Sequence, residues 1–198
     1  MSTFWDERFQ QATYVYGEAP NDFLAANWQL FPKGELLSLG EGEGRNAVFL
    51  AEQGLKVTAM DSSQAGLAKL AQLAERRGVQ VPTERGDLTQ ADLGHERWEG
   101  LYNIFCHLPS EARQALYGRI KQALKPGGLF LTEQFTPEQL NYTSGGPKDP
   151  DMLVTLDELR RAFGGWDVLV ASEEVIQLDE GPFHQGAASV VRFIARKP

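Results

Sequence analysis

The chain has 198 residues, which is the length of one ordinary domain with a full hydrophobic core. Lys and Arg number 19 against 27 Asp and Glu, so the formal net charge is -8. This acidic balance argues against a nucleic-acid partner, because phosphate backbones require a basic face. A single cysteine excludes an intramolecular disulfide, and with three histidines beside it we expect no metal site.

The N-terminal residues do not resemble a targeting segment. Residues 1–12, MSTFWDERFQQA, lack the apolar stretch of a secretory signal, and no window approaches the roughly 18 apolar residues of a membrane span. We therefore expect a cytoplasmic protein with no membrane partner, acting as a monomer or homodimer. Helical pieces are expected at 4–10 and 21–30, and residues 1–33 are interpreted as a lid that carries Phe4, Trp5, Tyr14 and Tyr16.

From residue 34 onward, short apolar runs alternate with amphipathic stretches, which is the pattern of a parallel α/β sheet. Strands are expected at 35–39, 55–60, 79–84, 101–106 and 129–135. Helices are expected at 45–53, from Ser62 or Ser63 to Gly78, and at 110–124 with Ser110 as the cap.

The C-terminal part begins with a long loop at 136–154, and a loop of that length in a compact domain is usually functional. TLDE at 155–158 is a capping box that opens a helix to about residue 163. Runs at 166–177 and 189–195 leave no room for a helix between them, so they must pair as an antiparallel hairpin. Residues 34–198 are therefore predicted to form a Rossmann-like, doubly wound, seven-stranded sheet, mostly parallel, within a single α/β domain.

The glycine-rich sequence GEGEG at 40–44 directly follows the first expected strand and precedes a helix. Such a loop brings backbone N–H groups and a helix N-terminus against a ligand that approaches the main chain. Asp61 lies about 20 residues further on, at the end of the next strand, where a carboxylate can accept both hydroxyls of a ribose. The pattern favours a nucleoside ligand over a plain strand-to-helix turn.

This loop differs from the dinucleotide fingerprint G-x-G-x-x-G. Arg45 occupies its sixth position, and the third glycine comes one residue early. The carboxylates of Glu41 and Glu43 would lie unfavourably beside a pyrophosphate, but they tolerate a sulfonium and an amine. The loop therefore favours a cationic ligand without phosphate.

Four features in this order carry a resemblance: the GEGEG loop, Asp61, GDL at 86–88 and LKPGG at 124–128. Together they resemble the class I S-adenosylmethionine-dependent methyltransferases, from about residue 34 to the C-terminus. Within that class, GRNAVFLA at 44–51, with Phe4-Trp5 and Tyr16-Gly17, resembles the small tellurite-resistance-type and thiopurine-type enzymes. The resemblance implies S-adenosylmethionine as cofactor and S-adenosylhomocysteine as product.

The resemblance also implies which residues contact the methyl donor. Gly40 and Gly42 would lie against its methionine part, and Asp61 would hold the ribose hydroxyls. At the adenine, Asp87 would accept a hydrogen bond from the amino group. The remaining residues expected to bind the donor are Tyr16, Glu41, Arg45, Asn46, Ser62, Leu88 and Phe105.

One position departs from the family. Ser38 stands two residues before the first glycine, where the family usually carries an acid. Glu41 is expected to take over part of the contact with the donor's ammonium. If neither residue makes that contact, the affinity for the donor should be modest.

Methyl transfer from a sulfonium is an in-line displacement, which needs alignment and a dry pocket more than a covalent residue. The candidate catalytic residues are His107 after the fourth strand, Glu133 at the fifth, and His184 at the hairpin tip. His107 can instead order its loop, and a hairpin tip also favours polar residues for contact with solvent.

We therefore expect a methyltransferase for a small-molecule acceptor: a thiol, a chalcogen oxyanion or a metabolite hydroxyl. The early third glycine argues against the first alternative, an NAD(P)-dependent oxidoreductase. The second alternative is a regulatory module that binds S-adenosylmethionine without turnover.

Overall fold

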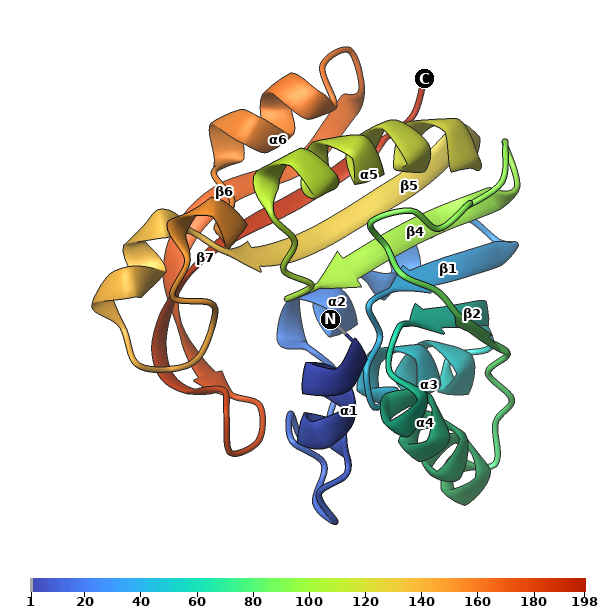
Figure 1. The fold of residues 1–198 in the computed structure, drawn as a ribbon. Helices are drawn as coiled ribbons and strands as arrows, with labels where there is room; N and C mark the ends of the chain where they lie inside the picture. The colour runs from blue at the N-terminus through green and yellow to red at the C-terminus, as the bar shows by residue number, and fades with distance from the viewer. Residues whose placement is uncertain (1) are drawn as a thin grey trace.

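The computed structural model describes residues 2–198 and shows a seven-stranded sheet between two layers of helices (Figure 1). The strands lie in the order β3-β2-β1-β4-β5-β7-β6. Their bounds are β1 (Glu35–Leu39), β2 (Lys56–Asp61), β3 (Thr83–Arg85), β4 (Trp98–Ile104), β5 (Leu124–Phe135), β6 (Asp167–Asp179) and β7 (Gln185–Arg196). Strands β1 to β5 pair in parallel, and β7 runs antiparallel to both β5 and β6. The predicted fold class and C-terminal hairpin are confirmed.

Helices cover both faces of the sheet. Their bounds are α1 (Ser2–Phe9), α2 (Asp22–Asn27), α3 (Arg45–Glu52), α4 (Gln64–Arg77), α5 (Ser110–Ala123) and α6 (Leu156–Ala162), with 3-10 turns at Trp28–Leu30, Pro137–Asn141 and Pro150–Met152. Helices α2, α3 and α4 share one apolar cluster with the sheet, and α5 and α6 share the other. Within residues 2–198, no helix combines the length and apolar character needed to cross a membrane.

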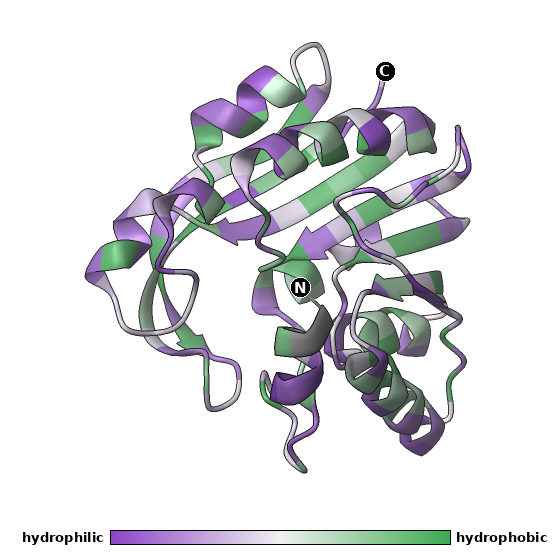
Figure 2. Cartoon of the chain, in the orientation of Figure 1, coloured by the Kyte–Doolittle hydropathy of each residue, from purple (hydrophilic) through white to green (hydrophobic). Residues whose placement is uncertain are grey.

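The apolar side chains follow the expected pattern of a sheet buried on both faces. Hydrophobic residues concentrate along β1, β4 and β5 (Figure 2). Leu36 faces the cluster with α3, whereas its neighbour Leu37 faces the cluster with α5, and both side chains are fully buried. Consecutive apolar residues in β1 therefore pack against helices on opposite faces of the sheet.

Several strands differ from their predicted bounds; β5, for example, begins at Leu124 instead of residue 129. The third was expected from residue 79, but Val79 and Val81 pack against Leu73 of α4 and only Thr83–Arg85 joins the sheet. The fourth was expected to reach residue 106, but it ends at Ile104. Phe105 adopts a φ of +50°, which turns the chain out of the sheet.

The N-terminal caps of two helices also differ in detail from the prediction. Pro109, not Ser110, precedes α5 as its cap, and the Ser110 N–H donates to Asp151 Oδ2 at 2.9 Å. At α6, Thr155 Oγ1 accepts from the Glu158 N–H at 3.2 Å, as the capping box predicts. The Glu158 carboxylate does not complete the box, because it pairs with Arg113 at 2.7 Å.

Candidate active site

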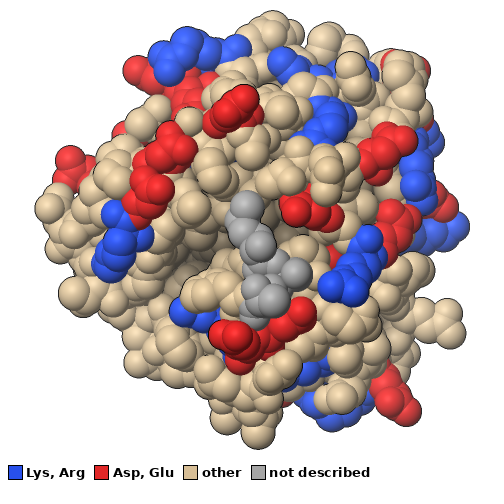
Figure 3. Space-filling model, viewed as in Figure 1, with Lys and Arg blue, Asp and Glu red and all other residues tan. Residues whose placement is uncertain are grey.

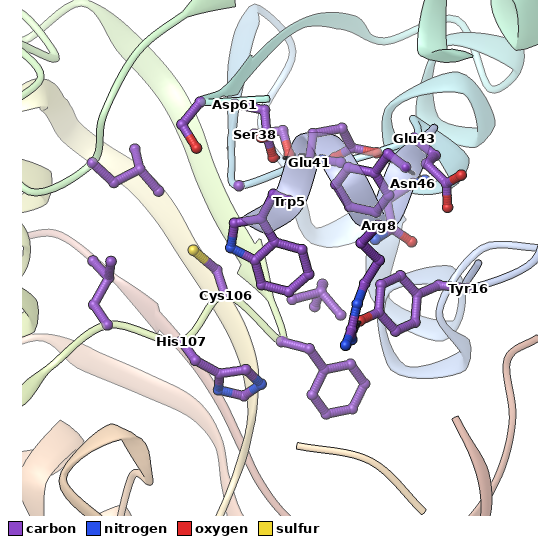
Figure 4. Close-up of a pocket in the computed structure, with 18 of the residues that line it drawn as sticks. Trp5, Arg8, Tyr16, Ser38, Glu41, Glu43, Asn46, Asp61, Cys106 and His107 are labelled. Atoms are coloured by element: carbon purple, nitrogen blue, oxygen red, sulfur yellow. Dashed lines mark hydrogen bonds between the residues drawn. The ribbon is translucent and has the colours of Figure 1, made fainter. Parts of the chain in front are cut away.

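A cavity of about 450 Å³ lies at the carboxyl ends of β1, β2 and β4 (Figure 4). The strand order reverses between β1 and β4, and in doubly wound sheets the binding crevice lies at that point. The volume is within the roughly 300–1,000 Å³ of small-molecule sites. All predicted site residues except Glu133 line it: Tyr16, Gly40, Glu41, Gly42, Arg45, Asn46, Asp61, Ser62, Asp87, Leu88, Phe105, His107 and His184.

Two glycines of the loop after β1 allow close approaches. Gly40 has a φ of +71°, and a Cβ there would lie 2.5 Å from Cys106 Sγ, after β4. Gly44 has a φ of +96°, and a Cβ there would lie 2.9 Å from Leu70 Cα, so the glycine lets α3 pack against α4. The early third glycine therefore allows a close helix–helix contact, whereas the third glycine of the dinucleotide fingerprint allows a helix to pack closely on a strand.

Asp61 fastens the glycine loop to the end of β2. Its Oδ2 accepts from the Gly42 N–H at 2.7 Å, and its Oδ1 accepts from the Ser63 N–H at 2.7 Å. Burial raises the pKa of this carboxyl, although the backbone hydrogen bonds oppose the shift. A carboxylate can accept about four hydrogen bonds, so Asp61 retains capacity for hydroxyls in the cavity.

The Glu41 carboxylate is buried and accepts hydrogen bonds on both oxygens. Oε1 accepts from the N–H groups of Asn46 and Ala47 at 3.0 and 2.8 Å, at the start of α3. Oε2 accepts from Ser38 Oγ and, at 3.0 Å, from the Tyr102 hydroxyl. Burial raises the pKa of Glu41, against the effect of these donors. The carboxylate thus lies beside Ser38, where the family usually has an acid.

The N-terminal segment forms one wall of the cavity. Trp5 and Tyr16 face the interior, and Arg8 lies beside Tyr16, donating from Nη1 to its hydroxyl at 3.1 Å (Figure 4). The Arg8 guanidinium also lies 4.9 Å from the centroid of the Phe183 ring, at the hairpin tip. Tyr14, in contrast, does not line the cavity, and its hydroxyl donates to the carbonyl of Lys69.

Glu43 joins this wall to the glycine loop. Its carboxylate forms a buried ion pair with Lys69 of α4. The Val15 N–H donates to Glu43 Oε2 at 2.8 Å. The second acid of the GEGEG loop therefore anchors the chain on which Tyr16 lies.

The opposite wall carries groups that are neutral at physiological pH. His107 stacks on Phe135, with ring centroids 5.5 Å apart, and burial lowers its pKa to about 3. Among the described residues, the Nδ1 atom of His107 has no hydrogen-bond partner. Burial raises the pKa of Cys106 to about 12, so this thiol stays protonated. Cys106 lines the cavity and also packs against the hydrophobic cluster that contains α5.

The adenine-side candidates lie at the rim. Asp87 is exposed, and the Thr89 N–H and hydroxyl donate to its Oδ1 at 2.9 and 2.8 Å. These hydrogen bonds lower the pKa of Asp87, so the group is ionised at neutral pH. Leu88, the next residue, is buried and offers an apolar surface to the cavity.

Glu133 lies behind the wall rather than in it. This residue of β5 is fully buried, pairs with Arg192 of β7, and accepts from Asn21 Nδ2 at 2.7 Å. The same Asn21 Nδ2 donates to Glu180 Oε1 at 2.9 Å. The sequence did not indicate the roles of Asn21 and Arg192. Asn21 also caps α2, where its Oδ1 accepts from the Leu24 N–H, so this asparagine already has a local explanation.

Known proteins share sequence similarity with this chain. Residues 36–128 match the family described as "Methyltransferase domain". The chain is 27% identical to "Hemagglutinin 1" of Eikenella corrodens, covering 82% of this chain and 54% of that protein. It is 26% identical to a "Sterol 24-C-methyltransferase" of Eremothecium gossypii, covering 91% of this chain and 54% of that protein. The chain thus spans about half the length of these curated relatives.

Solved structures agree on the fold. A structure described as "Conversion of a Disulfide Bond into a Thioacetal Group during Echinomycin Biosynthesis" matches with a TM-score of 0.80 at 18% identity, covering 100% of this chain and 91% of the other. TehB from Haemophilus influenzae matches with a TM-score of 0.72 at 19% identity, covering 100% of this chain and 67% of the other. The match of residues 36–128 to a methyltransferase domain and the shared fold agree with the predicted resemblance to class I S-adenosylmethionine-dependent methyltransferases.

Proposed function

We propose that this chain is an S-adenosylmethionine-dependent methyltransferase that acts on a small-molecule acceptor. The observation that carries the proposal is one cavity with two chemically different ends. The glycine loop, Asp61 and Asp87 supply the contacts that a nucleoside needs. His107 and His184 lie at the other end, where an acceptor would meet the methyl group.

The cavity fits the donor on its own chemistry. The φ values of Gly40 and Gly42, +71° and +64°, keep their backbone free of side chains where a ligand approaches. Glu41 and Asp61 place carboxylates beside this loop, and the cation that follows the loop, Arg45, is paired with Glu180. The bound donor supplies an electrophilic methyl group, and these residues bind and orient it.

The acceptor end supports a small molecule: a thiol, a chalcogen oxyanion or a hydroxyl. Its walls include Trp5, Phe105 and Leu108, which exclude water as an in-line displacement requires. Both buried histidines are neutral at pH 7, but burial lowers the pKa of His107 to about 3, so His107 is a poor proton acceptor. The lid role of residues 1–33, the cytoplasmic location and the monomeric or homodimeric state stay predictions.

Calorimetric titration of the full chain with S-adenosylhomocysteine and with NADH tests the proposal. We expect S-adenosylhomocysteine to bind, and Asp61→Asn to weaken it about tenfold, because a charged acceptor for hydroxyls is lost. Asp167→Asn, at an exposed position of β6, is the matched control and should leave the affinity unchanged. No binding of S-adenosylhomocysteine, or tighter binding of NADH, would reject the proposal.

The catalytic part needs a second measurement. Consumption of S-adenosylmethionine is followed across a panel of thiols, selenite and tellurite. Methyl transfer to any of them separates an enzyme from a regulatory module with the same pocket.

A further inference from the structure

Glu180, in the turn between β6 and β7, is the common acceptor for three side chains. Its Oε2 accepts from Arg45 Nη2 at 2.7 Å and lies 3.3 Å from His184 Nδ1. Its Oε1 accepts from Asn21 Nδ2 at 2.9 Å. The side chains of Glu180 and His184 are only 10% and 6% exposed, so the whole cluster lies out of water. It joins the N-terminal segment, α3 and the hairpin.

These contacts determine the protonation of both partners. Burial alone would raise the pKa of Glu180, but the hydrogen bond from His184 and the charge of Arg45 hold it at about 2. The Glu180 carboxylate is therefore ionised at neutral pH and only accepts hydrogen bonds. Burial lowers the pKa of His184, although Glu180 opposes this shift, so the imidazole is neutral and carries one N–H.

The position of that N–H follows from electrostatics. If Nδ1 were unprotonated, its lone pair would face the ionised carboxylate of Glu180, which is unfavourable. His184 is therefore the Nδ1–H tautomer, and its lone pair is on Nε2. Among the described residues, no group hydrogen-bonds Nε2, and His184 lines the cavity.

Packing holds the ring of His184 in this orientation. Its centroid lies 4.5 Å from that of Tyr16 and 4.9 Å from that of Phe105. The backbone of Gly145 packs against the ring edge, where a Cβ would lie 2.7 Å from His184 Cδ2. His107, the other histidine of the cavity, has no carboxylate that orients it among residues 2–198.

We propose that Glu180 is a positioning residue, which is held by Asn21 and Arg45 and presents His184 Nε2 to the methyl acceptor as a proton acceptor. This inference rests on the proposed function. It narrows the substrate class to acceptors whose reacting group carries a proton, namely thiols and hydroxyls. The S–H or O–H bond breaks and its proton goes to Nε2. The freed lone pair bonds the methyl carbon, and the carbon–sulfur bond of the donor breaks with its electron pair remaining on sulfur.

The charges in this step balance within the cluster. The positive charge of the donor sulfonium disappears as the imidazolium of His184 forms. The ionised Glu180 faces that imidazolium through Nδ1 and stabilises it. An acceptor that is already an oxyanion would not use this arrangement, so a chalcogen oxyanion is the less suitable member of the class.

The tautomer is directly measurable, because the chain has three histidines. Long-range ¹H–¹⁵N spectra of the labelled full chain are recorded across a pH series, and His184→Gln assigns the His184 signals. We expect a neutral Nδ1–H imidazole at pH 7. In Glu180→Gln we expect this preference to be lost and the pKa of His184 to fall by about one unit, a tenfold loss of proton affinity. Glu75→Gln, at an exposed position of α4, should change neither readout.

An Nε2–H tautomer in the wild-type protein would overturn the inference, as would an unchanged tautomer and pKa in Glu180→Gln. The wild-type spectrum decides the question by itself if Glu180→Gln does not fold. S-adenosylhomocysteine is titrated into the same samples. Binding together with an Nε2–H tautomer rejects only the role of Glu180, whereas absence of binding rejects the proposed function.

Discussion

Ser38 stands where the resembled family usually carries an acid, and Glu41 brings a carboxylate to the same point by another route. The side chain of Glu41 reaches back from the loop to Ser38 Oγ and the Tyr102 hydroxyl. Its other oxygen accepts the N–H groups that the first turn of α3 leaves unpaired. The carboxylate therefore stabilises the helix start and the glycine loop together. Its contact with the donor's ammonium stays a prediction.

Substitutions of Glu41 should separate its hydrogen bonds from its charge. In Glu41→Gln the carbonyl oxygen can face the two N–H groups while the amide nitrogen donates to the hydroxyls of Ser38 and Tyr102. We expect a loss of about 1 kcal/mol or less in the free energy of unfolding. Glu41→Ala leaves these donors unpaired in a buried site, and we expect a loss of about 3 kcal/mol or more. Urea unfolding measures both; equal losses would contradict the assigned hydrogen bonds.

At the scale of elements, the N-terminal segment and the β6–β7 hairpin meet through two glycines. A Cβ on Gly181 would lie 2.5 Å from the backbone nitrogen of Gly17 and 2.8 Å from the carbonyl oxygen of Val15. Neither of these backbone atoms is able to move without shifting its segment. The contact closes the cavity between Tyr16, on the N-terminal side, and His184, on the hairpin.

Gly181→Ala should separate the two elements. Its φ of +76° makes any side chain unfavourable, and the steric conflict with Gly17 adds to that strain. Gly127→Ala is the matched control, because Gly127 has the same φ of +76° and a Cβ there would meet no atom within 4 Å. Both variants should lose about 1 kcal/mol of stability from the backbone strain. Only Gly181→Ala should lose more and also weaken S-adenosylhomocysteine binding in calorimetry; equal effects would show that the contact does not shape the cavity.

The elements also show what the sequence is able to reveal. The strand at 35–39, the glycine loop and the following helix were predictable, because glycine positions and apolar spacing act locally. The third strand was misjudged, because Val79 and Val81 satisfy strand propensity while they pack on α4. The pairing of Asn21 with Glu133 and Glu180 joins residues far apart in the chain. No local pattern encodes such contacts, so the polar cluster behind the cavity emerged only from the fold.

At the scale of the whole molecule, folding removes several ionisable groups from water. The visible face mixes acidic and basic side chains around the hollow of the cavity (Figure 3). Inside, His107 and His184 have lowered pKa values, and that of Glu180 is about 2. Burial raises the pKa values of Glu41 and Asp61 instead. Stability therefore depends on pH through groups that also shape the site.

The histidines favour a loss of stability as the pH falls below neutral. The usual pKa of His107 is 6.5 and its folded value is about 3, so the unfolded chain takes up a proton that the folded chain refuses. Stability is then present above pH 6.5 and falls as the pH drops from 6.5 towards 3. The usual pKa of Glu180 is 4.5 and its folded value is about 2, so stability also falls as the pH drops below 4.5. The raised pKa values of Glu41 and Asp61 act in the opposite direction.

Replacing His107 should therefore flatten the pH dependence of the whole molecule. One proton corresponds to a slope of at most about 1.4 kcal/mol per pH unit. We expect the free energy of unfolding, measured in urea at pH 7, 6 and 5, to fall less steeply in His107→Gln than in the wild type. His95→Gln, at an exposed position, is the control and should keep the wild-type slope. The difference between variants isolates His107 from the opposing acids, since these are present in every sample. A His107→Gln slope equal to the wild-type slope would mean that His107 takes up its proton in the folded cavity as readily as in water, which contradicts its burial against Phe135.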